Sequence, residues 1–485
     1  MRWGRGGPPR PFWRRAYATD QKQRQELQRE RDKNLLAGSW VACGVQDGEE
    51  LVRLGHCISP AFCIPKKDDP DPRACIDMRI LNESAKKQSA RPEGLDLVPS
   101  LAQKGWYAMS RDVKKAFHHV GIDQADWPYM TVDLGEPIGP ISADNPRFVY
   151  VVVLPFGYTN SPAVWQKTMM CIIKRCREQG VPCTLWLDDV LILGATAEAC
   201  RAHDKIFQEE CEAHGIKLHP DKGQHEPKQT ILHLGLLIDL KRGLFLVPPA
   251  KAARLMKEAK GMLCSACSAK NRRFVRARWL AQLAGLCISL YLAVPSARFR
   301  TRSFYDVLKA HDVYSRGYHH MVKLSEAALT DLRWWATLAD NNVSRAIWRP
   351  PCTATMWVDA SKIPGAGSGA ILSGPRPEDG TTPARSIWTK QELLRSINFL
   401  ELRAIKVHLL QFERRLAHSV LLIWEDNQAV MFIMNNLVSR SPEMMCYMYI
   451  RLKDNSIKTT ISGTVRPCTR EVPKYSWKYS WKYSW

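Results

Sequence analysis

Short apolar runs separated by turn residues dominate the chain from Cys57 to about residue 240. This spacing predicts short strands joined by tight turns. In residues 184–193, two adjacent aspartates stand between two apolar segments. Because neighbouring side chains of a strand point to opposite faces, a hairpin with the pair at its tip lets both carboxylates reach solvent. We predict such a hairpin at Asp188 and Asp189, although an ordinary polar turn could contain the same pair.

Two more strand patterns precede this hairpin. Residues 63–67 and 73–79 predict strands joined by the turn 68–72, which would bring Lys66 and Arg73 together. Two cations so placed could bind a triphosphate. The alternative is an ordinary surface hairpin, whose basic residues have no binding role. Residues 106–113 predict a strand that carries Asp112 near its end.

A third carboxylate that meets the Asp188–Asp189 pair would complete a metal site. Burying unpaired carboxylates costs several kcal/mol, roughly, unless a cation neutralises them. Two divalent ions about 3.5 to 4 Å apart can activate a hydroxyl and stabilise the leaving oxygen of a phosphoryl displacement. If Asp112 joins the pair, the chemistry is nucleotidyl transfer.

The pattern changes after residue 240. Residues 241–350 are helix-rich and basic, and within them the apolar stretch Trp279–Val294 predicts a buried helix that is too short to span a membrane. After Pro350-Pro351, strand, helix and strand patterns carry Asp359, Glu401 and Asp426 in turn.

The two ends of the chain lack a core-forming pattern. We expect residues 1–38 to be a basic, disordered segment with a solvated helix in its second half, and residues 446–485 to be an irregular tail containing a repeat.

The amino-acid composition indicates which kind of molecule the protein binds. The 485 residues include 70 Lys+Arg and 48 Asp+Glu, a formal net charge of +22 that favours a polyanion partner. The basic residues are spread along the chain, so nucleic acid is favoured over a membrane. Fifteen scattered cysteines and no secretory signal indicate an intracellular protein of the cytoplasm or nucleus. Cys200, Phe207 and Cys211 fall on one helical stripe, which favours core packing over a zinc site.

Five motifs occur in the order and spacing found in reverse transcriptases, and the chain resembles this family. They are Arg73-x-x-x-Asp77-x-Arg79-x-Leu81-Asn82, Asp112-x-x-x-x-Phe117, the segment 154–163, Leu187-Asp188-Asp189 and His233-Leu234-Gly235. The resemblance implies an α+β right-hand polymerase with fingers and palm in residues 39–240 and a helical thumb or connection in 241–350. An α/β RNase H-like domain with a mixed sheet, which we expect to be incomplete, would follow in 351–445.

The resemblance also implies roles for single residues at the polymerase centre. Asp112, Asp188 and Asp189 match the catalytic acids, and they would hold two Mg²⁺ ions, or Mn²⁺, together with the backbone carbonyl of Val113. Trp186 departs from the tyrosine that many relatives have two positions before the first paired aspartate.

Further matches concern the incoming nucleotide. Lys66 and Arg73 match the triphosphate-binding pair, and Phe117 matches the residue that excludes a ribose 2′-hydroxyl. Phe156 and Gly157 match the strip against the nucleotide, and Lys222 matches a lysine near the leaving phosphate. The expected partners are an RNA template, a DNA primer or RNA–DNA hybrid, and dNTPs.

Residues 283–295 and 331–335 resemble the region after the palm in retrotransposons of the DIRS-like and Ngaro-like group, and the C-terminal domain resembles the RNase H of the same group. Asp359, Glu401 and Asp426 match its metal-binding acids, but a fourth carboxylate and a His-bearing loop are not recognisable after Met445. The sequence therefore leaves RNase H activity open. It also leaves open an inactive nucleic-acid-binding relic, and a telomerase-like polymerase, against which the RNase H-like segment argues.

Overall fold

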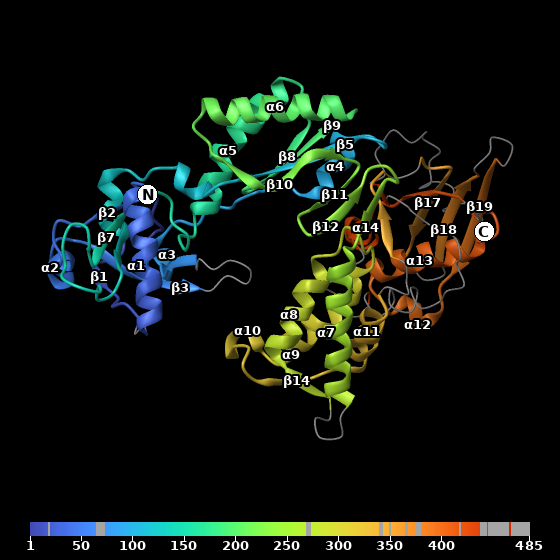
Figure 1. Cartoon of the computed structure of the whole chain (residues 1–485). Coiled ribbons are helices and arrows are strands. Elements are labelled where there is room, and N and C mark those ends of the chain that lie inside the picture. The colour runs from blue at the N-terminus through green and yellow to red at the C-terminus, as the bar shows by residue number, and fades with distance from the viewer. Residues whose placement is uncertain are drawn as a thin grey trace. The chain divides into compact units, whose positions relative to one another are not determined.

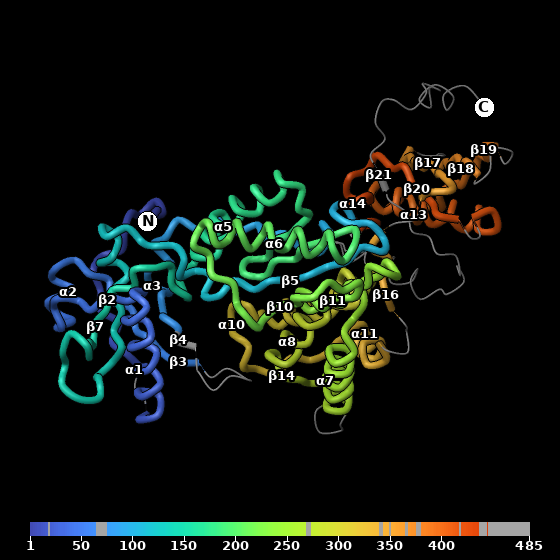
Figure 2. The backbone as a smooth tube through the Cα atoms, turned by 45° about the horizontal axis from the view of Figure 1, so that its top comes forward, coloured from blue at the N-terminus to red at the C-terminus, as the bar shows by residue number. Residues whose placement is uncertain are grey.

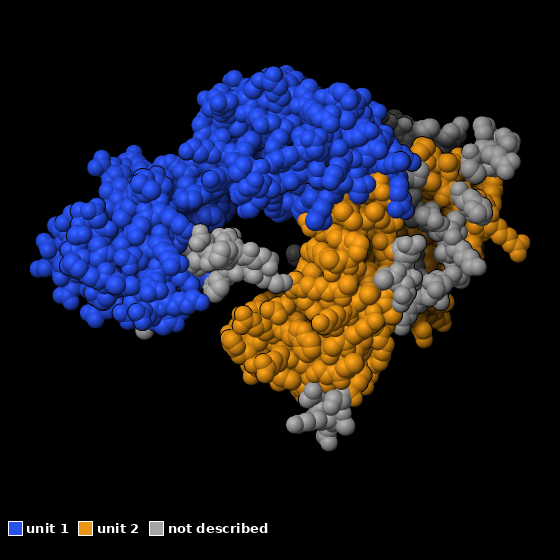
Figure 3. Space-filling view, in the orientation of Figure 1, with its two compact units in different colours: residues 1–234, 240–242 blue, residues 235–239, 243–485 orange. Residues whose placement is uncertain are grey.

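The computed structural model describes residues 1–17, 20–64, 73–267, 273–338, 343–348, 351–363, 367–374, 380–416 and 419–436, with Met444 and the short strand Val465–Arg466. The chain forms two compact units (Figure 3). The first comprises residues 1–234 and 240–242, and the second comprises residues 235–239 and 243–485. Within the described residues, no helix combines the length and apolar character needed to cross a bilayer.

The N-terminal part of the first unit is built on one mixed sheet, here called the fingers sheet. Its strand order is β1-β3-β6-β7-β2, and β4 pairs with the far part of β3. Helix α1 packs beside β3 (Figure 2). The elements are β1 (Phe12–Trp13), α1 (Gln21–Leu36), β2 (Trp40–Ala42), α2 (Gly48–Arg53), β3 (Cys57–Ile64), β4 (Arg73–Ile76), α3 (Arg79–Ser84), β6 (Thr131–Asp133) and β7 (Phe148–Val151).

The second strand of the predicted hairpin is shorter than the sequence suggested. β4 ends at Ile76 and α3 begins at Arg79, because the buried carboxylate of Asp77 turns the chain there. Asp77 accepts hydrogen bonds from Arg79 Nε at 2.8 Å and from the Tyr17 hydroxyl at 2.5 Å, and it pairs with Arg14 at 2.8 Å. These contacts hold the pKa of Asp77 well below its usual range, with the Arg79 hydrogen bond as the main cause.

The structure differs from our expectation of a disordered segment at residues 1–38. β1 pairs in parallel with β3, and the Trp3 ring lies 4.8 Å from that of Tyr129. Helix α1 begins with an Asp20 capping box and buries Leu27 and Arg31. Several contacts of this segment join residues that are far apart in sequence, as Trp3 and Tyr129 or Arg31 and Asn145 are, so a local pattern could not reveal them.

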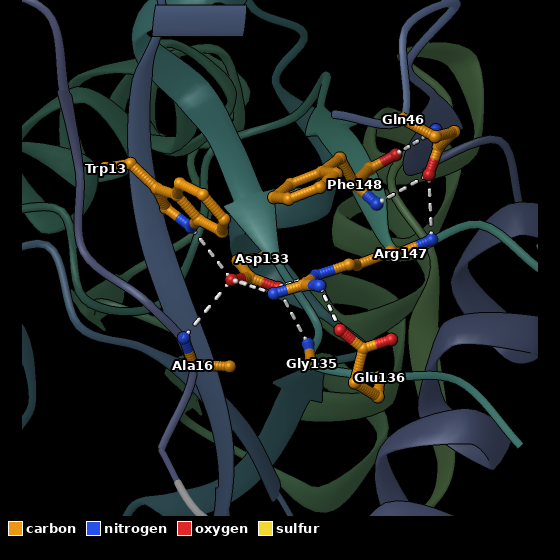
Figure 4. Close-up of polar contacts among 8 residues, drawn as sticks. All are labelled: Trp13, Ala16, Gln46, Asp133, Gly135, Glu136, Arg147 and Phe148. Atoms are coloured by element: carbon orange, nitrogen blue, oxygen red, sulfur yellow. Dashed lines mark hydrogen bonds and ion pairs between the residues drawn. The ribbon is translucent and has the colours of Figure 1, made fainter. Parts of the chain in front are cut away.

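A buried carboxylate anchors this N-terminal segment to the fingers sheet (Figure 4). Asp133 is fully buried and accepts hydrogen bonds from Trp13 Nε1 at 2.9 Å, Ala16 N at 3.2 Å and Gly135 N at 2.9 Å. Arg147 Nε donates to the same carboxylate at 3.1 Å, and its guanidinium lies 5.4 Å from the Trp13 ring centre. Because the charge is paired and fully hydrogen-bonded, its burial is tolerated.

The palm sheet is antiparallel with the strand order β10-β5-β9-β8. It consists of β5 (Tyr107–Val113), β8 (Cys183–Trp186), β9 (Asp189–Gly194) and β10 (Leu218–Lys228). Helices α5 (Ser161–Glu178) and α6 (Ala197–Ala213) cover one face (Figure 1). Their core includes Trp165, Ile173, Phe207 and Cys211, and the predicted stripe of Cys200, Phe207 and Cys211 is buried. The remaining elements are η1 (Leu95–Leu97), α4 (Val98–Leu101), η2 (Ala116–His119), η3 (Gln124–Met130) and β11 (Thr230–His233).

The second unit begins with a helical part. Its helices are α7 (Pro249–Cys267), α8 (Ala277–Ile288), α9 (Ala297–Ala310), α10 (Val313–Arg316) and α11 (Glu326–Ala336). Short strands accompany them: β12 (Leu236–Asp239), β13 (Leu244–Leu246), β14 (Phe274–Arg276), β15 (Met321–Lys323) and β16 (Ser344–Ala346). The predicted helix over 279–294 ends at Ile288, but Leu290, Ala293 and Val294 are buried as expected.

A mixed sheet with the order β19-β18-β17-β20-β21 ends the second unit. β17 pairs antiparallel with β18 and parallel with β20, as the predicted RNase H-like domain requires. Helix α13 packs on this sheet through Leu400 and Ile405. The elements are β17 (Ala354–Ala360), β18 (Gly367–Ser373), β19 (Thr381–Ile387), α12 (Lys390–Leu393), α13 (Ile397–Gln411), β20 (Leu421–Trp424), α14 (Gln428–Asn436) and β21 (Val465–Arg466).

The Asp133 anchor gives a first testable prediction. We expect Asp133→Ala to lower the free energy of unfolding of the first unit by about 3 kcal/mol, because it removes the buried one of the two carboxylates that pair with Arg147. Glu136→Gln is the control, since Glu136 also pairs with Arg147 but is exposed, and the cost should stay below about 1 kcal/mol. Urea unfolding and hydrogen exchange measure the two effects. Unchanged exchange protection of residues 12–17 in Asp133→Ala would contradict the anchor.

Candidate functional site

The β8–β9 hairpin and strand β5 bring the predicted acids together. The register pairs Asp112 on β5 directly with Asp189 on β9. Asp188 occupies the turn between β8 and β9, and its backbone carbonyl accepts a hydrogen bond from Val113 N at 2.9 Å. The Asp188 side chain is exposed, and those of Asp112 and Asp189 are half-buried. The three acids therefore meet at one end of the palm sheet, as the sequence predicted.

Helix α5 fixes the turn that presents Asp188. Leu187 has φ of +55°, a conformation that residues other than glycine rarely adopt. Its carbonyl accepts a hydrogen bond from Trp165 Nε1 at 2.9 Å, and its N–H donates to Gln166 Oε1 at 3.0 Å. The sequence analysis did not identify Trp165 and Gln166, because both occupy ordinary helix positions and nothing in the local sequence indicates this role.

Burial and neighbouring charges raise the pKa values of Asp112 and Asp189. Burial raises the pKa of Asp112, and the charge of Asp188 adds to this, whereas Lys222 and His219 act in the opposite direction. Burial, followed by the charges of Asp188 and Asp112, raises the pKa of Asp189 to about 6. Like charges held this close favour a bound cation. The oxygen ligands suit Mg²⁺ or Mn²⁺.

A cavity of about 630 Å³ opens beside these acids within the first unit. Asp112 and Asp188 line it together with Lys114, Lys115 and Lys222. Lysines next to carboxylates give the cavity a cationic side that suits phosphate and an acidic side that suits metal ions.

Two aromatic rings form a further wall of the cavity. Phe117 and Phe156 line it, with ring centres 4.9 Å apart. The adjacent Gly157 has φ of +109°, and a Cβ there would lie 2.3 Å from the Ile76 carbonyl oxygen, so only glycine fits. Asn82 holds this strip by donating to the Gly157 carbonyl at 2.8 Å and accepting from Thr159 N at 2.8 Å.

The structure says little about two of the predicted nucleotide-binding residues, Lys66 and Arg73. Lys66 and the turn 68–72 fall outside the described residues. Arg73 begins β4, where its backbone pairs with Ile64 of β3.

Trp186, which stands where many reverse transcriptases have a tyrosine, ends β8 opposite Asp189 and is 40% exposed.

A second acidic cluster lies in the RNase H-like domain. Carboxylate oxygens of Asp359, Glu401 and Asp426 all lie within 4.8 Å of one another, and no other set of this kind occurs among the described residues. Burial raises the pKa of Asp359, with the Asp426 charge adding to it, and raises that of Glu401 to about 9, with Glu425 as the next cause. Three oxygen ligands this close suit a hard divalent cation.

Solved structures share the fold of this chain. The foamy viral protease-reverse transcriptase in complex with an RNA/DNA hybrid matches with a TM-score of 0.54 and 16% identity, over 96% of this chain and 56% of that one. The same protein in complex with dsDNA matches with a TM-score of 0.53 and 15% identity, over 96% and 86% of the two chains. The fold is therefore that of a right-hand polymerase followed by an RNase H-like domain.

Sequence comparisons indicate which kind of polymerase domain the chain contains. Residues 64–258 match the family of reverse transcriptases, described as RNA-dependent DNA polymerases. Polyprotein P3 of Commelina yellow mottle virus is 24% identical over 172 residues, which is 36% of this chain and 8% of that protein. The Gag-Pro-Pol polyprotein of squirrel monkey retrovirus is 28% identical over 168 residues, 34% of this chain and 9% of that protein. The chain thus spans a small part of these polyproteins, and it carries a reverse transcriptase domain of the retroelement type.

The raised pKa of Asp189 gives a prediction for the metal-free protein. Its pKa rises from an ordinary 3.8 to about 6 on folding, so folding binds protons between these values and stability falls as pH rises through this window. We expect Asp189→Asn to raise the melting temperature in EDTA at pH 7.5 and to raise it less at pH 4.5, where most of this window has not yet been crossed. Asp144→Asn, which alters an exposed loop, is the control. An equal effect of Asp189→Asn at both pH values would contradict the assigned cause.

Proposed function

We propose that this chain is an RNA-directed DNA polymerase that adds deoxynucleotides to the 3′ end of a primer. The observation that carries the proposal is the pairing of Asp112 with Asp189 across β5 and β9, with Asp188 in the adjoining turn at the cavity. Acids at one end of an antiparallel palm sheet are what nucleotidyl transfer with metal ions requires.

The metal ions are assigned to the acids of the palm. Asp112, Asp188, Asp189 and the carbonyl of Val113 would hold two Mg²⁺ ions, or Mn²⁺. These ions supply activation of the primer hydroxyl and charge stabilisation at the leaving phosphate. The mutual repulsion of Asp112, Asp188 and Asp189 supports this assignment, because a bound cation relieves it.

The remaining predicted residues would bind the nucleotide. Lys66 and Arg73 would hold the triphosphate, and Lys222, which lines the cavity, would lie near the leaving phosphate. Phe156 and Gly157 would lie against the base. Phe117 would fill the space that a ribose 2′-hydroxyl needs, and its contact with Phe156 supports this role.

An RNA template and a DNA primer, or an RNA–DNA hybrid, are the proposed polymer partners. The net charge of +22 supports a polyanion, and the solved relatives are complexes with dsDNA or an RNA/DNA hybrid. We place the enzyme inside the cell. We also assign it to retroelements of the DIRS-like and Ngaro-like group, on the resemblance of residues 283–295 and 331–335.

For the RNase H-like domain we propose that Asp359, Glu401 and Asp426 hold a divalent cation. The spacing of their oxygens supports this role. A cation there would serve hydrolysis of the RNA strand of a hybrid.

Primer extension on an RNA template tests the polymerase assignment. We expect Asp188→Asn to lower extension by more than about 100-fold, because the loss of a direct metal ligand should exceed the roughly 10- to 100-fold cost of losing a supporting residue. Asp144→Asn, with the same chemical change in an exposed loop, should extend like wild type. Wild-type extension no greater than that of Asp188→Asn would overturn the proposal, and salt-dependent RNA binding without extension would identify an inactive relic.

Sugar selection tests the role of Phe117. We expect Phe117→Ala to raise ribonucleotide incorporation relative to deoxynucleotide incorporation by roughly tenfold or more, because truncation opens space beside Phe156. Phe117→Tyr keeps the ring and should keep the selectivity. Single-nucleotide incorporation kinetics give the ratio. An unchanged ratio in a Phe117→Ala enzyme that still extends with dNTPs would rule out this role.

A further inference from the structure

The N-terminal segment contacts a residue of the fingers that lies next to the cavity. Arg14 and Tyr17 precede residues 64–258, the part of the chain that matches the reverse transcriptase family. Both nevertheless contact Asp77, which stands between β4 and α3. The Tyr17 hydroxyl donates to Asp77 Oδ2 at 2.5 Å, and the Arg14 guanidinium pairs with the same oxygen at 2.8 Å. Two residues from the start of the chain therefore fix the end of β4.

The Tyr17 hydroxyl joins two charged side chains. It donates to Asp77 and accepts a hydrogen bond from Arg79 Nη2 at 3.3 Å, while Arg79 Nη2 also donates to Asp77 Oδ2 at 2.7 Å. The Tyr17 ring lies edge to face with that of Phe62 on β3, with ring centres 5.7 Å apart, which fixes the direction of the hydroxyl. Asp77 is buried, and hydrogen bonds to an ionised group are stronger than neutral ones. Loss of the hydroxyl should therefore loosen the residues around Asp77.

Asp77 is one residue away from the wall of the cavity. The preceding residue, Ile76, lines the cavity, and its carbonyl oxygen is so close to Gly157 that a Cβ there would lie 2.3 Å from it. Asp77 N donates to the Pro60 carbonyl of β3 at 2.9 Å, which continues the pairing of β3 with β4 up to this point. A displacement of Asp77 would thus move Ile76 against the backbone of Gly157, which we proposed to lie against the base.

The other end of β4 carries Arg73, which we proposed to hold the triphosphate. The strand is four residues long, and its register runs from Ile64 opposite Arg73 to Ala61 opposite Ile76. So short a strand spans only about 13 Å, so a shift at one end is felt at the other. The contacts of Asp77 therefore bear on both groups that β4 offers to a nucleotide.

We propose that Tyr17 is a positioning residue for the incoming nucleotide. Through Asp77 it holds β4, and with it Ile76 and Arg73, in the geometry that binds a dNTP, and Arg14 supplies a second contact to the same carboxylate. The inference rests on the polymerase function proposed above. Because Tyr17 acts on binding and not on the metal site, its hydroxyl should affect the KM for the nucleotide and leave kcat unchanged.

Single-nucleotide incorporation on an RNA template tests this role. Tyr17→Phe keeps the ring and removes the hydroxyl, and we expect the KM for the dNTP to rise about threefold to tenfold with kcat within about twofold of wild type. Tyr107→Phe is the matched control, because Tyr107 begins β5 at the end remote from Asp112 and its hydroxyl bonds to no described residue. Both constants should stay near the wild-type values in this control. An unchanged KM in Tyr17→Phe, with or without a lower kcat, would overturn the proposal.

A double-mutant cycle tests whether Tyr17 acts through Asp77. Asp77→Asn removes the charge that the hydroxyl contacts, so Tyr17→Phe added to it should raise the KM by less than about twofold further. Two increases in KM that multiply would show that Tyr17 acts by another route, and they would overturn the proposed one.

Hydrogen exchange separates this inference from the polymerase assignment and needs only the Tyr17→Phe variant. Without substrate, Tyr17→Phe should exchange faster than wild type at residues 73–79 and at the wild-type rate at residues 107–113 of β5. Unchanged exchange at residues 73–79 would overturn the role of Tyr17, whatever the KM. Faster exchange there in a protein whose wild type extends no primer would instead overturn the proposed function, and the nucleotide role with it.

Discussion

The register between β5 and β9 decides what the first unit can do. It sets Asp112 opposite Asp189, and the hairpin turn adds Asp188, so three carboxylates from distant parts of the chain share one end of the palm sheet. A shift of one residue would turn one member of this pair to the opposite face. The burial of Val190 and Ile192 in the core that α5 and α6 form against the sheet holds that register, and Trp165 and Gln166 hold the turn. Packing thus offsets the repulsion that the acids create.

Carboxylates are buried at several places in the chain, and the cost of burying their charge is met in two different ways. Asp77 and Asp133 are buried carboxylates whose charges are met by arginines, so they stabilise the fingers without outside help. At the palm and in the RNase H-like domain, acids gather without a paired arginine among the described residues, and burial raises the pKa values of Asp189 and Glu401. A carboxylate that pairs directly with an arginine serves the fold, whereas a set of carboxylates without such a partner is poised for a cation from solution.

Much of this site could be predicted because its chemistry is local in sequence. An Asp-Asp pair between apolar runs predicts its own hairpin, and a strand carrying Asp112 near its end fits beside it. The mixed sheet of the second unit was expected from the resemblance of residues 351–445 to RNase H, and the structure forms one. What could not be predicted depends on distant partners. The anchoring of Trp13 by Asp133, the support of Leu187 by Trp165 and Gln166, and the hydrogen bond from Tyr17 to Asp77 arise from tertiary contacts that leave no periodic signal.

Crystals of the chain grown with a primer–template, a deoxynucleotide and Mn²⁺ provide the decisive measurement. Manganese scatters anomalously, so its position can be read independently of the protein coordinates. The account predicts anomalous peaks within coordination distance, about 2.0 to 2.6 Å, of carboxylate oxygens from both Asp112 and Asp188. Bound nucleotide with no manganese at these two side chains would contradict it.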